Sequence, residues 1–316
     1  MTGGLPAGCV VCECLARDGL QHEPGIVPLE GKVEAIERLA DLGFRRIEAT
    51  SFSHPGRVPQ FADAEEVLRR IRRRPGVIYK ATCVNATAVR RAAEAAAAGH
   101  GPSEISLVVS ASEAHSRRNV RRTHREMRDQ LREALRLART AGLPAVGTVA
   151  TAFGCPFTGP VALEQVEAWV ELFTAHDVTL ISLADTTGMG NPLAVEERFG
   201  QLRERWPGVR WIGHFHDTRG TGIANCVAAL RAGVHHLDSA FGGLGGHPPG
   251  IVYGRGDTGN VATEDLVALL DDMGVETGID VERLLDGVQL AERTVGRSVG
   301  GKVARAGLTR HLLAGE

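Results

Sequence analysis

The sequence predicts a (β/α)8 barrel followed by additional C-terminal helices. Apolar, strand-like runs begin near residues 9, 45, 77, 104, 144, 178, 210 and 235, and a segment with helical periodicity follows each of them. Strands that alternate with helices pair in parallel. Eight such units within about 265 residues fit a closed barrel better than an open, doubly wound sheet.

The predicted helices lie at residues 31 to 43, 63 to 74, 85 to 98, 123 to 141, 163 to 175, 192 to 205, 220 to 232 and 263 to 273. Glycine stands at the C-terminal end of several of them, where it is the usual cap, as at Gly99, Gly142 and Gly274. We expect residues 9 to 275 to form the barrel. No Pro- or Ser-rich linker precedes residues 276 to 316, so these are expected to add one or two helices packed on the barrel.

Composition indicates a globular protein and excludes several functions. The chain has 316 residues, 43% of them hydrophobic, and a net charge of −2, so no global charge attracts it to nucleic acid or to an anionic membrane. No apolar run approaches the length of a membrane span and the N-terminus lacks signal-peptide features, so we expect a cytoplasmic protein. The spacing of the six cysteines favours packed thiols over disulfides, a zinc site or a redox site.

Polar side chains follow the predicted strands at their C-terminal ends, where active sites of this fold lie. His214 and His216 are two residues apart on the seventh strand, so both imidazoles point to the same face and can reach one ion. Asp18 after the first strand and Asn260 after the eighth are expected at the same mouth. This mixed nitrogen and oxygen set suits Mg2+ or Mn2+, and Zn2+, Co2+ or Fe2+ are also compatible with it. Taken singly, each residue also fits an ordinary structural role.

Eight short motifs occur in the order seen in one enzyme family. They are Arg17-Asp18-Gly19-Leu20-Gln21, Ile47-Glu48-Ala49-Thr50-Ser51-Phe52, Val58-Pro59-Gln60, Phe153-Gly154-Cys155-Pro156, Asp185-Thr186, His214-Phe215-His216-Asp217-Thr218, Gly243-Leu244-Gly245-Gly246 and Gly259-Asn260-Val261-Ala262-Thr263-Glu264-Asp265. From about residue 9 to 303 the chain therefore resembles the 3-hydroxy-3-methylglutaryl-CoA (HMG-CoA) lyases. These belong to the DRE-TIM metallolyases, together with related aldolases and Claisen-type synthases.

The resemblance implies a retro-Claisen cleavage of a branched 3-hydroxyacyl-CoA, giving acetyl-CoA and the keto acid acetoacetate. It implies a divalent metal held by Asp18, His214, His216 and Asn260, which would lower the pKa of the substrate hydroxyl. Arg17, oriented by Glu48, would stabilise the departing enolate. The remaining implied site residues are Asp185 as a proton-relay or supporting group, Asp217 as a partner that orients a histidine, and Gln21, Ser51 and Thr186 as substrate contacts.

The loop after the eighth strand departs from the family pattern. The lyases carry cysteine directly after Gly-Leu-Gly-Gly, whereas this chain has His247, and residues 248 to 259 form a longer stretch before Asn260. Histidine is a competent acid at neutral pH, so His247 is our candidate for protonating the enolate, with a changed pH profile. The alternatives are another substrate or reaction direction, a lost activity, or a residue that only packs the loop.

An arginine-rich segment, residues 117 to 122, follows the fourth strand on the same side of the barrel. Arg117 and Arg118 are candidates for binding the phosphates of CoA, and a solvated helix start is the competing interpretation. The segment at residues 69 to 74 is expected on the surface. No aromatic side chains interleave with its arginines, which argues against nucleic-acid binding.

Two other functions remain open on the sequence. One is a condensing Claisen-type synthase, or an aldolase acting on CoA-free hydroxy-oxo acids, which the missing cysteine favours and the first-strand motif disfavours. The other is a catalytically silent binding protein that retains the pocket, although such a protein has little reason to keep Arg17 and the whole metal set. A homodimer is expected from the group alone.

Overall fold

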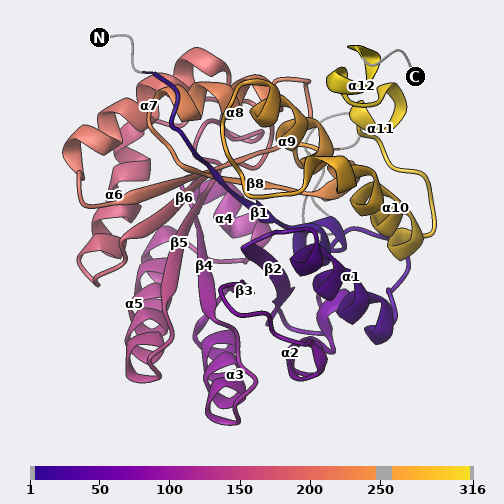
Figure 1. The fold of residues 1–316 in the computed structure, drawn as a ribbon. Helices are drawn as coiled ribbons and strands as arrows, with labels where there is room; N and C mark the ends of the chain where they lie inside the picture. Colours follow the sequence, from indigo (N-terminus) through magenta and orange to yellow (C-terminus); the bar gives the residue numbers. More distant parts are fainter. Residues whose placement is uncertain (1–3, 247–257, 314–316) are drawn as a thin grey trace.

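A computed structural model of the chain describes residues 4–246 and 258–313. Within them eight parallel strands close into a barrel in the order of the sequence, which confirms the predicted fold (Figure 1). The strands are β1 Val10–Glu13, β2 Arg46–Ser51, β3 Ile78–Cys83, β4 Glu104–Ser110, β5 Ala145–Ala150, β6 Leu180–Asp185, β7 Arg210–Phe215 and β8 His236–Ser239.

Helices cover the outside of the barrel close to the predicted ranges. They are α1 Leu29–Asp41, α2 Ala64–Arg70, α3 Ala86–Ala97, α5 His124–Thr140, α6 Leu163–Thr174, α7 Pro192–Arg205, α8 Gly222–Arg231 and α9 Thr263–Asp272. One short helix, α4 Glu113–Asn119, was not predicted. It begins at Ser112, whose side chain accepts a hydrogen bond from the N–H of His115, and its last turn carries Arg117 and Arg118.

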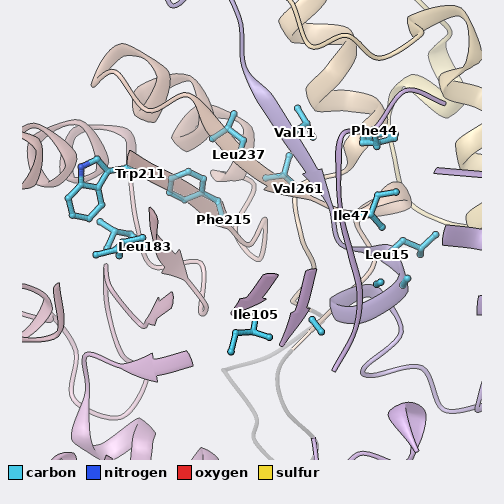
Figure 2. Close-up of a cluster of buried hydrophobic side chains, with 14 of the residues drawn as sticks. Val11, Leu15, Phe44, Ile47, Ile105, Leu183, Trp211, Phe215, Leu237 and Val261 are labelled. Carbon is cyan, nitrogen blue, oxygen red and sulfur yellow. The ribbon is translucent and has the colours of Figure 1, made fainter. Parts of the chain in front are cut away.

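Strand side chains alternate between two different environments. One set, including Val11, Ile47 and Leu237, is apolar and packs between the strands and the helices (Figure 2). The alternate positions face the barrel interior, and several of them hold buried charged residues. These residues are Arg46, Glu48, Lys80, Glu104 and Asp238. Barrels of this fold are usually filled with branched apolar side chains, so this polar interior is an unusual feature of the chain.

The C-terminal helices pack on the outside of the barrel, against α1 and α9. Helix α10 Leu284–Val295 lies beside α1 and α9 (Figure 1), and α11 Val303–Ala306 and α12 Thr309–Leu313 follow it. Gly287 of α10 allows close packing, because a Cβ atom at this position would lie 2.2 Å from Cζ of Phe241. All six cysteines are buried and unpaired. In the described part of the chain, no helix combines the length and the apolar character needed to cross a membrane.

Candidate active site

A π-helical turn, η1 Leu15–Gly19, directly follows β1 and carries the first two site residues. Its backbone bonds run from Gly19 to Cys14 and from Leu20 to Leu15, and such turns are frequent at functional sites. Nη1 of Arg17 donates to Asp18 Oδ1 at 2.6 Å, and Nη2 donates to Glu48 Oε2 at 2.9 Å. The two carboxylates therefore fix the guanidinium plane.

Two histidines converge on Asp18, His214 within β7 and His216 directly after it. Nε2 of His214 lies 3.2 Å from Nε2 of His216, and Asp18 Oδ2 lies 3.8 Å and 3.6 Å from these two nitrogens. The Nδ1 atoms point away from this centre, to Asp238 Oδ2 and to Thr258 Oγ1, each at 3.1 Å. A carboxylate that accepts from Nδ1–H leaves a basic Nε2 free to bind a metal.

Asn260 completes the same centre from the segment after β8. Its Nδ2 donates to Asp18 Oδ2 and to the carbonyl of Leu244, both at 2.9 Å. Its Oδ1 is buried and has no hydrogen-bond partner among the described residues. An unpaired buried acceptor is costly unless a ligand satisfies it, so the oxygen suits a bound cation.

The residues present thus fit a divalent metal. Atoms of Asp18, His214 and His216 lie within 4.8 Å of one another, all three residues are buried, and the amide oxygen of Asn260 is unpaired. Nitrogen and oxygen ligands without thiolate suit a hard or borderline divalent ion.

Neighbouring charges keep Asp18, the acidic residue of this group, ionised. Burial alone would raise the pKa of Asp18, but Arg17 and the two histidines hold that pKa well below its usual range. The pKa of Glu48 is also lowered, because Arg17 and Lys80 outweigh its burial. Burial would lower the pKa of His214, but the hydrogen bond and negative charge of Asp238 raise it.

The partner that orients His214 differs from the one expected. The carboxylate of Asp217 accepts a hydrogen bond from the N–H of Gly222, at the start of α8, at 2.7 Å, and the histidine is held by Asp238 on β8. The signal for Asp238 in the sequence was a carboxylate inside the apolar run of the eighth strand. Its pairing with the seventh strand depends on the register, which places His214 opposite Asp238.

Asp185 lies at the end of β6 with both carboxylate oxygens engaged. They accept from the N–H groups of Met189 and Gly190, each at 2.9 Å, and shape the loop after the strand. Burial raises the pKa of Asp185 in spite of these bonds. Thr186 accepts from the N–H of Thr151 at 3.0 Å.

The other predicted residues lie around this mouth or outside the described residues. Gln21 lies in the turn after η1 and Ser51 hydrogen-bonds Ser53. Arg117 pairs with Glu113 at 2.6 Å on the exposed side of α4. The guanidinium of Arg118 lies 3.9 Å from the ring centre of Phe157. His247 lies outside the described residues.

Comparisons with known proteins find similar sequences and structures over most of the chain. The HMGL-like family model matches residues 9–290. Hydroxymethylglutaryl-CoA lyase YngG of Bacillus subtilis is 37% identical, and the alignment covers 92% of this chain and 95% of the relative. The cytoplasmic 3-hydroxy-3-methylglutaryl-CoA lyase of Mus musculus is 36% identical, and the alignment covers 98% of this chain and 88% of the relative. The solved structure of an HMG-CoA lyase from A. baumannii, in complex with coenzyme A and 3-methylmalate, has a TM-score of 0.88, 36% identity and 96% of both chains covered.

Proposed function

The chain belongs to the HMGL-like family of carbon–carbon lyases, and on this premise we propose that it cleaves HMG-CoA or a closely related 3-hydroxyacyl-CoA. The products would be acetyl-CoA and a keto acid, and for HMG-CoA itself the keto acid would be acetoacetate. One observation carries the proposal. Arg17, held by Asp18 and Glu48, lies against a buried centre where the ligand atoms of Asp18, His214 and His216 meet.

Asp18, His214, His216 and the Oδ1 atom of Asn260 would hold a divalent ion, with Mg2+ or Mn2+ favoured. When bound, such an ion supplies Lewis-acid polarisation of substrate oxygen atoms and lowers the pKa of a hydroxyl group. The carboxylate of Asp18 also lies 2.6 Å from Arg17, so the chain sets the metal centre and the cation side by side.

Arg17 would stabilise the negative charge that develops on the thioester oxygen as the carbon–carbon bond breaks. Burial opposes its charge, but Asp18 and Glu48 raise its pKa and keep it cationic. Its Nε–H is buried and lacks a hydrogen-bond partner among the described residues, so this donor remains for a substrate oxygen. The two carboxylates fix its direction before the substrate arrives.

His247 would protonate the enolate carbon. The proposal is supported by the course of the chain just before this residue, because a Cβ atom at Gly245 would lie 2.3 Å from Asn260 Nδ2 and 3.4 Å from Asp18 Oδ2. The backbone therefore passes directly beside the site, two residues before His247.

Arg117 and Arg118 would bind the phosphates of CoA at the end of α4. Arg118 is stacked on Phe157, which holds the guanidinium in place while its edge stays available for hydrogen bonds. The structure of the A. baumannii relative contains coenzyme A, which supports an acyl-CoA substrate here. A homodimer is part of the proposal and rests on the resemblance alone.

The test is an assay of metal-stripped protein with HMG-CoA, with and without Mg2+ or Mn2+, that follows acetyl-CoA release. We expect metal-dependent turnover that is lost in His247→Ala and retained in His247→Cys. His235→Ala is the matched control, since His235 is exposed and precedes β8 at the opposite end of the barrel. Absence of turnover with loaded metal would refute this substrate and favour the condensing or aldolase alternative.

A further inference from the structure

Lys80 is a buried lysine that the mechanism above does not use. It lies on β3 with 3% of its surface exposed, and the strand register places it between Glu48 of β2 and Glu104 of β4. Residues at paired positions point to the same face, so Lys80 projects into the barrel interior beneath the site. A buried ammonium is costly unless anions surround it.

The ammonium faces the two carboxylates that support the site. Nζ of Lys80 lies 3.7 Å from Glu48 Oε2 and 4.0 Å from Asp238 Oδ2. The same Oε2 atom accepts from Arg17 at 2.9 Å, and the same Oδ2 atom accepts from His214 at 3.1 Å. One cation therefore connects the arginine side of the site to the histidine side.

We propose that Lys80 is a positioning residue for the lyase reaction, whose ammonium holds Glu48 and Asp238 in place and so fixes Arg17 and His214 relative to each other. The inference rests on the proposed function and extends it to a residue outside the substrate pocket.

The other charged groups in the barrel interior do not replace Lys80. Arg46 forms its close ion pair with Glu104. Among the ion pairs of the described residues, Asp238 has only Lys80 and His214 as partners, and its Oδ1 atom has no hydrogen-bond partner. Removing Lys80 would leave Asp238 with the imidazole of His214 as its one ion-pair partner among the described residues.

The thiols of Cys12 and Cys14 lie near Asp238, and their ligand atoms and an Asp238 oxygen fall within 4.8 Å of one another. This group does not need a second metal ion to balance its charge. The ammonium of Lys80 already supplies a cation at this carboxylate.

The first test is steady-state kinetics of Lys80→Met at saturating metal. We expect kcat to fall about 10- to 100-fold, the usual effect of removing a group that orients a site residue. KM for the acyl-CoA should change less than about threefold, because Lys80 lies beneath the site. The matched control, Arg46→Met with Glu104→Gln, removes another buried ion pair of the barrel interior and should lower the melting temperature while kcat stays within about threefold of the wild-type value. A kcat for Lys80→Met within about twofold of the wild-type value would overturn the proposal.

The second test needs no activity. Melting temperatures of metal-free wild type, Lys80→Met, Asp238→Asn and the double variant form a double-mutant cycle. Each single change leaves a buried charge with one ion-pair partner fewer, whereas the double change removes both charges. The fall in melting temperature of the double variant should therefore be smaller than the sum of the two single falls. If the falls in melting temperature of the two single variants simply add in the double variant, Lys80 and Asp238 are not coupled and the proposal is overturned.

These outcomes separate the two proposals. A wild-type protein without lyase turnover would refute the proposed function, while the metal-free cycle would still test whether Lys80 supports Asp238. If Lys80→Met does not fold, recovery of folding in the double variant supports the proposal, and a double variant that is also unfolded counts against it.

Discussion

Replacing Glu13 by glutamine tests how the active-site turn is anchored. Glu13 is fully buried at the end of β1, where its carboxyl oxygens accept from the N–H of Leu15 and the N–H of Phe241, both at 2.7 Å, and from Thr263 Oγ1 at 3.3 Å. Leu15 opens the turn that carries Arg17, and Phe241 opens the glycine-rich segment. One carboxyl group therefore connects both parts of the site.

The expected effect depends on pH. Burial raises the pKa of Glu13 from 4.5 to about 8, in spite of the hydrogen bonds that lower it. Between these values the folded protein keeps the proton and the unfolded chain has lost it, so the free energy of unfolding falls as pH rises. At 1.36 kcal/mol per pKa unit, the whole loss between pH 4.5 and pH 8 is on the order of 5 kcal/mol.

Glutamine does not titrate, so Glu13→Gln should lose this part of the pH dependence. The NH2 group of the glutamine cannot accept a hydrogen bond, so one of the two backbone N–H donors loses its acceptor. This loss lowers the free energy of unfolding by about 1–3 kcal/mol at every pH. The variant should therefore be the less stable protein at pH 5 and the more stable one at pH 8.

The assay is urea unfolding of both proteins at pH 5, 6, 7 and 8, with linear extrapolation to water. Glu113→Gln is the matched control, because this carboxyl, whose side chain is 42% exposed, has a lowered pKa and stays ionised across the whole range. An identical pH slope in wild type and Glu13→Gln would refute the reasoning.

Three further predictions concern the metal, the packing of α10 and the cofactor part of the substrate. Asp18→Asn removes the anionic ligand and should weaken Mn2+ binding at least about 10- to 100-fold by isothermal titration; an unchanged affinity would place the metal elsewhere. Gly287→Ala puts a methyl group 2.2 Å from Cζ of Phe241 and should cost about 1–3 kcal/mol, seen as a lower melting temperature, whereas an unaltered one would contradict this packing. Arg118→Ala should raise KM for the acyl-CoA about tenfold with little change in kcat, whereas Arg132→Ala, at an exposed position of α5, should change neither. Equal effects of the two substitutions would argue against a phosphate site at Arg118.

Local patterns were sufficient to predict most elements. The helix predicted at residues 192 to 205 coincides with α7 Pro192–Arg205, and the strand predicted to begin near residue 104 is β4. The short helix α4 was missed because seven residues with buried His115 and Ser116 alone carry too little apolar periodicity. Its start depends on a side-chain cap by Ser112.

The parallel topology explains why candidate ligands could be chosen before their geometry was known. Asp18 and Asn260 are 242 positions apart, but both follow strands of one barrel, and all strand ends meet at the same mouth. The alternation of a strand also places His214 and His216 on one face. Their roles as metal ligands remain a prediction for the titration experiment.

The sequence by itself therefore determined the barrel and the mouth at which the candidate site residues were predicted, because periodicity and strand direction are local properties. Only the tertiary structure decided which side chains support them. Asp238 orients His214, where Asp217 had been expected, and Lys80 lies between Glu48 and Asp238. These contacts join β2, β3, β7 and β8 across the barrel, and they depend on strand register and closure, which no local pattern of residues encodes.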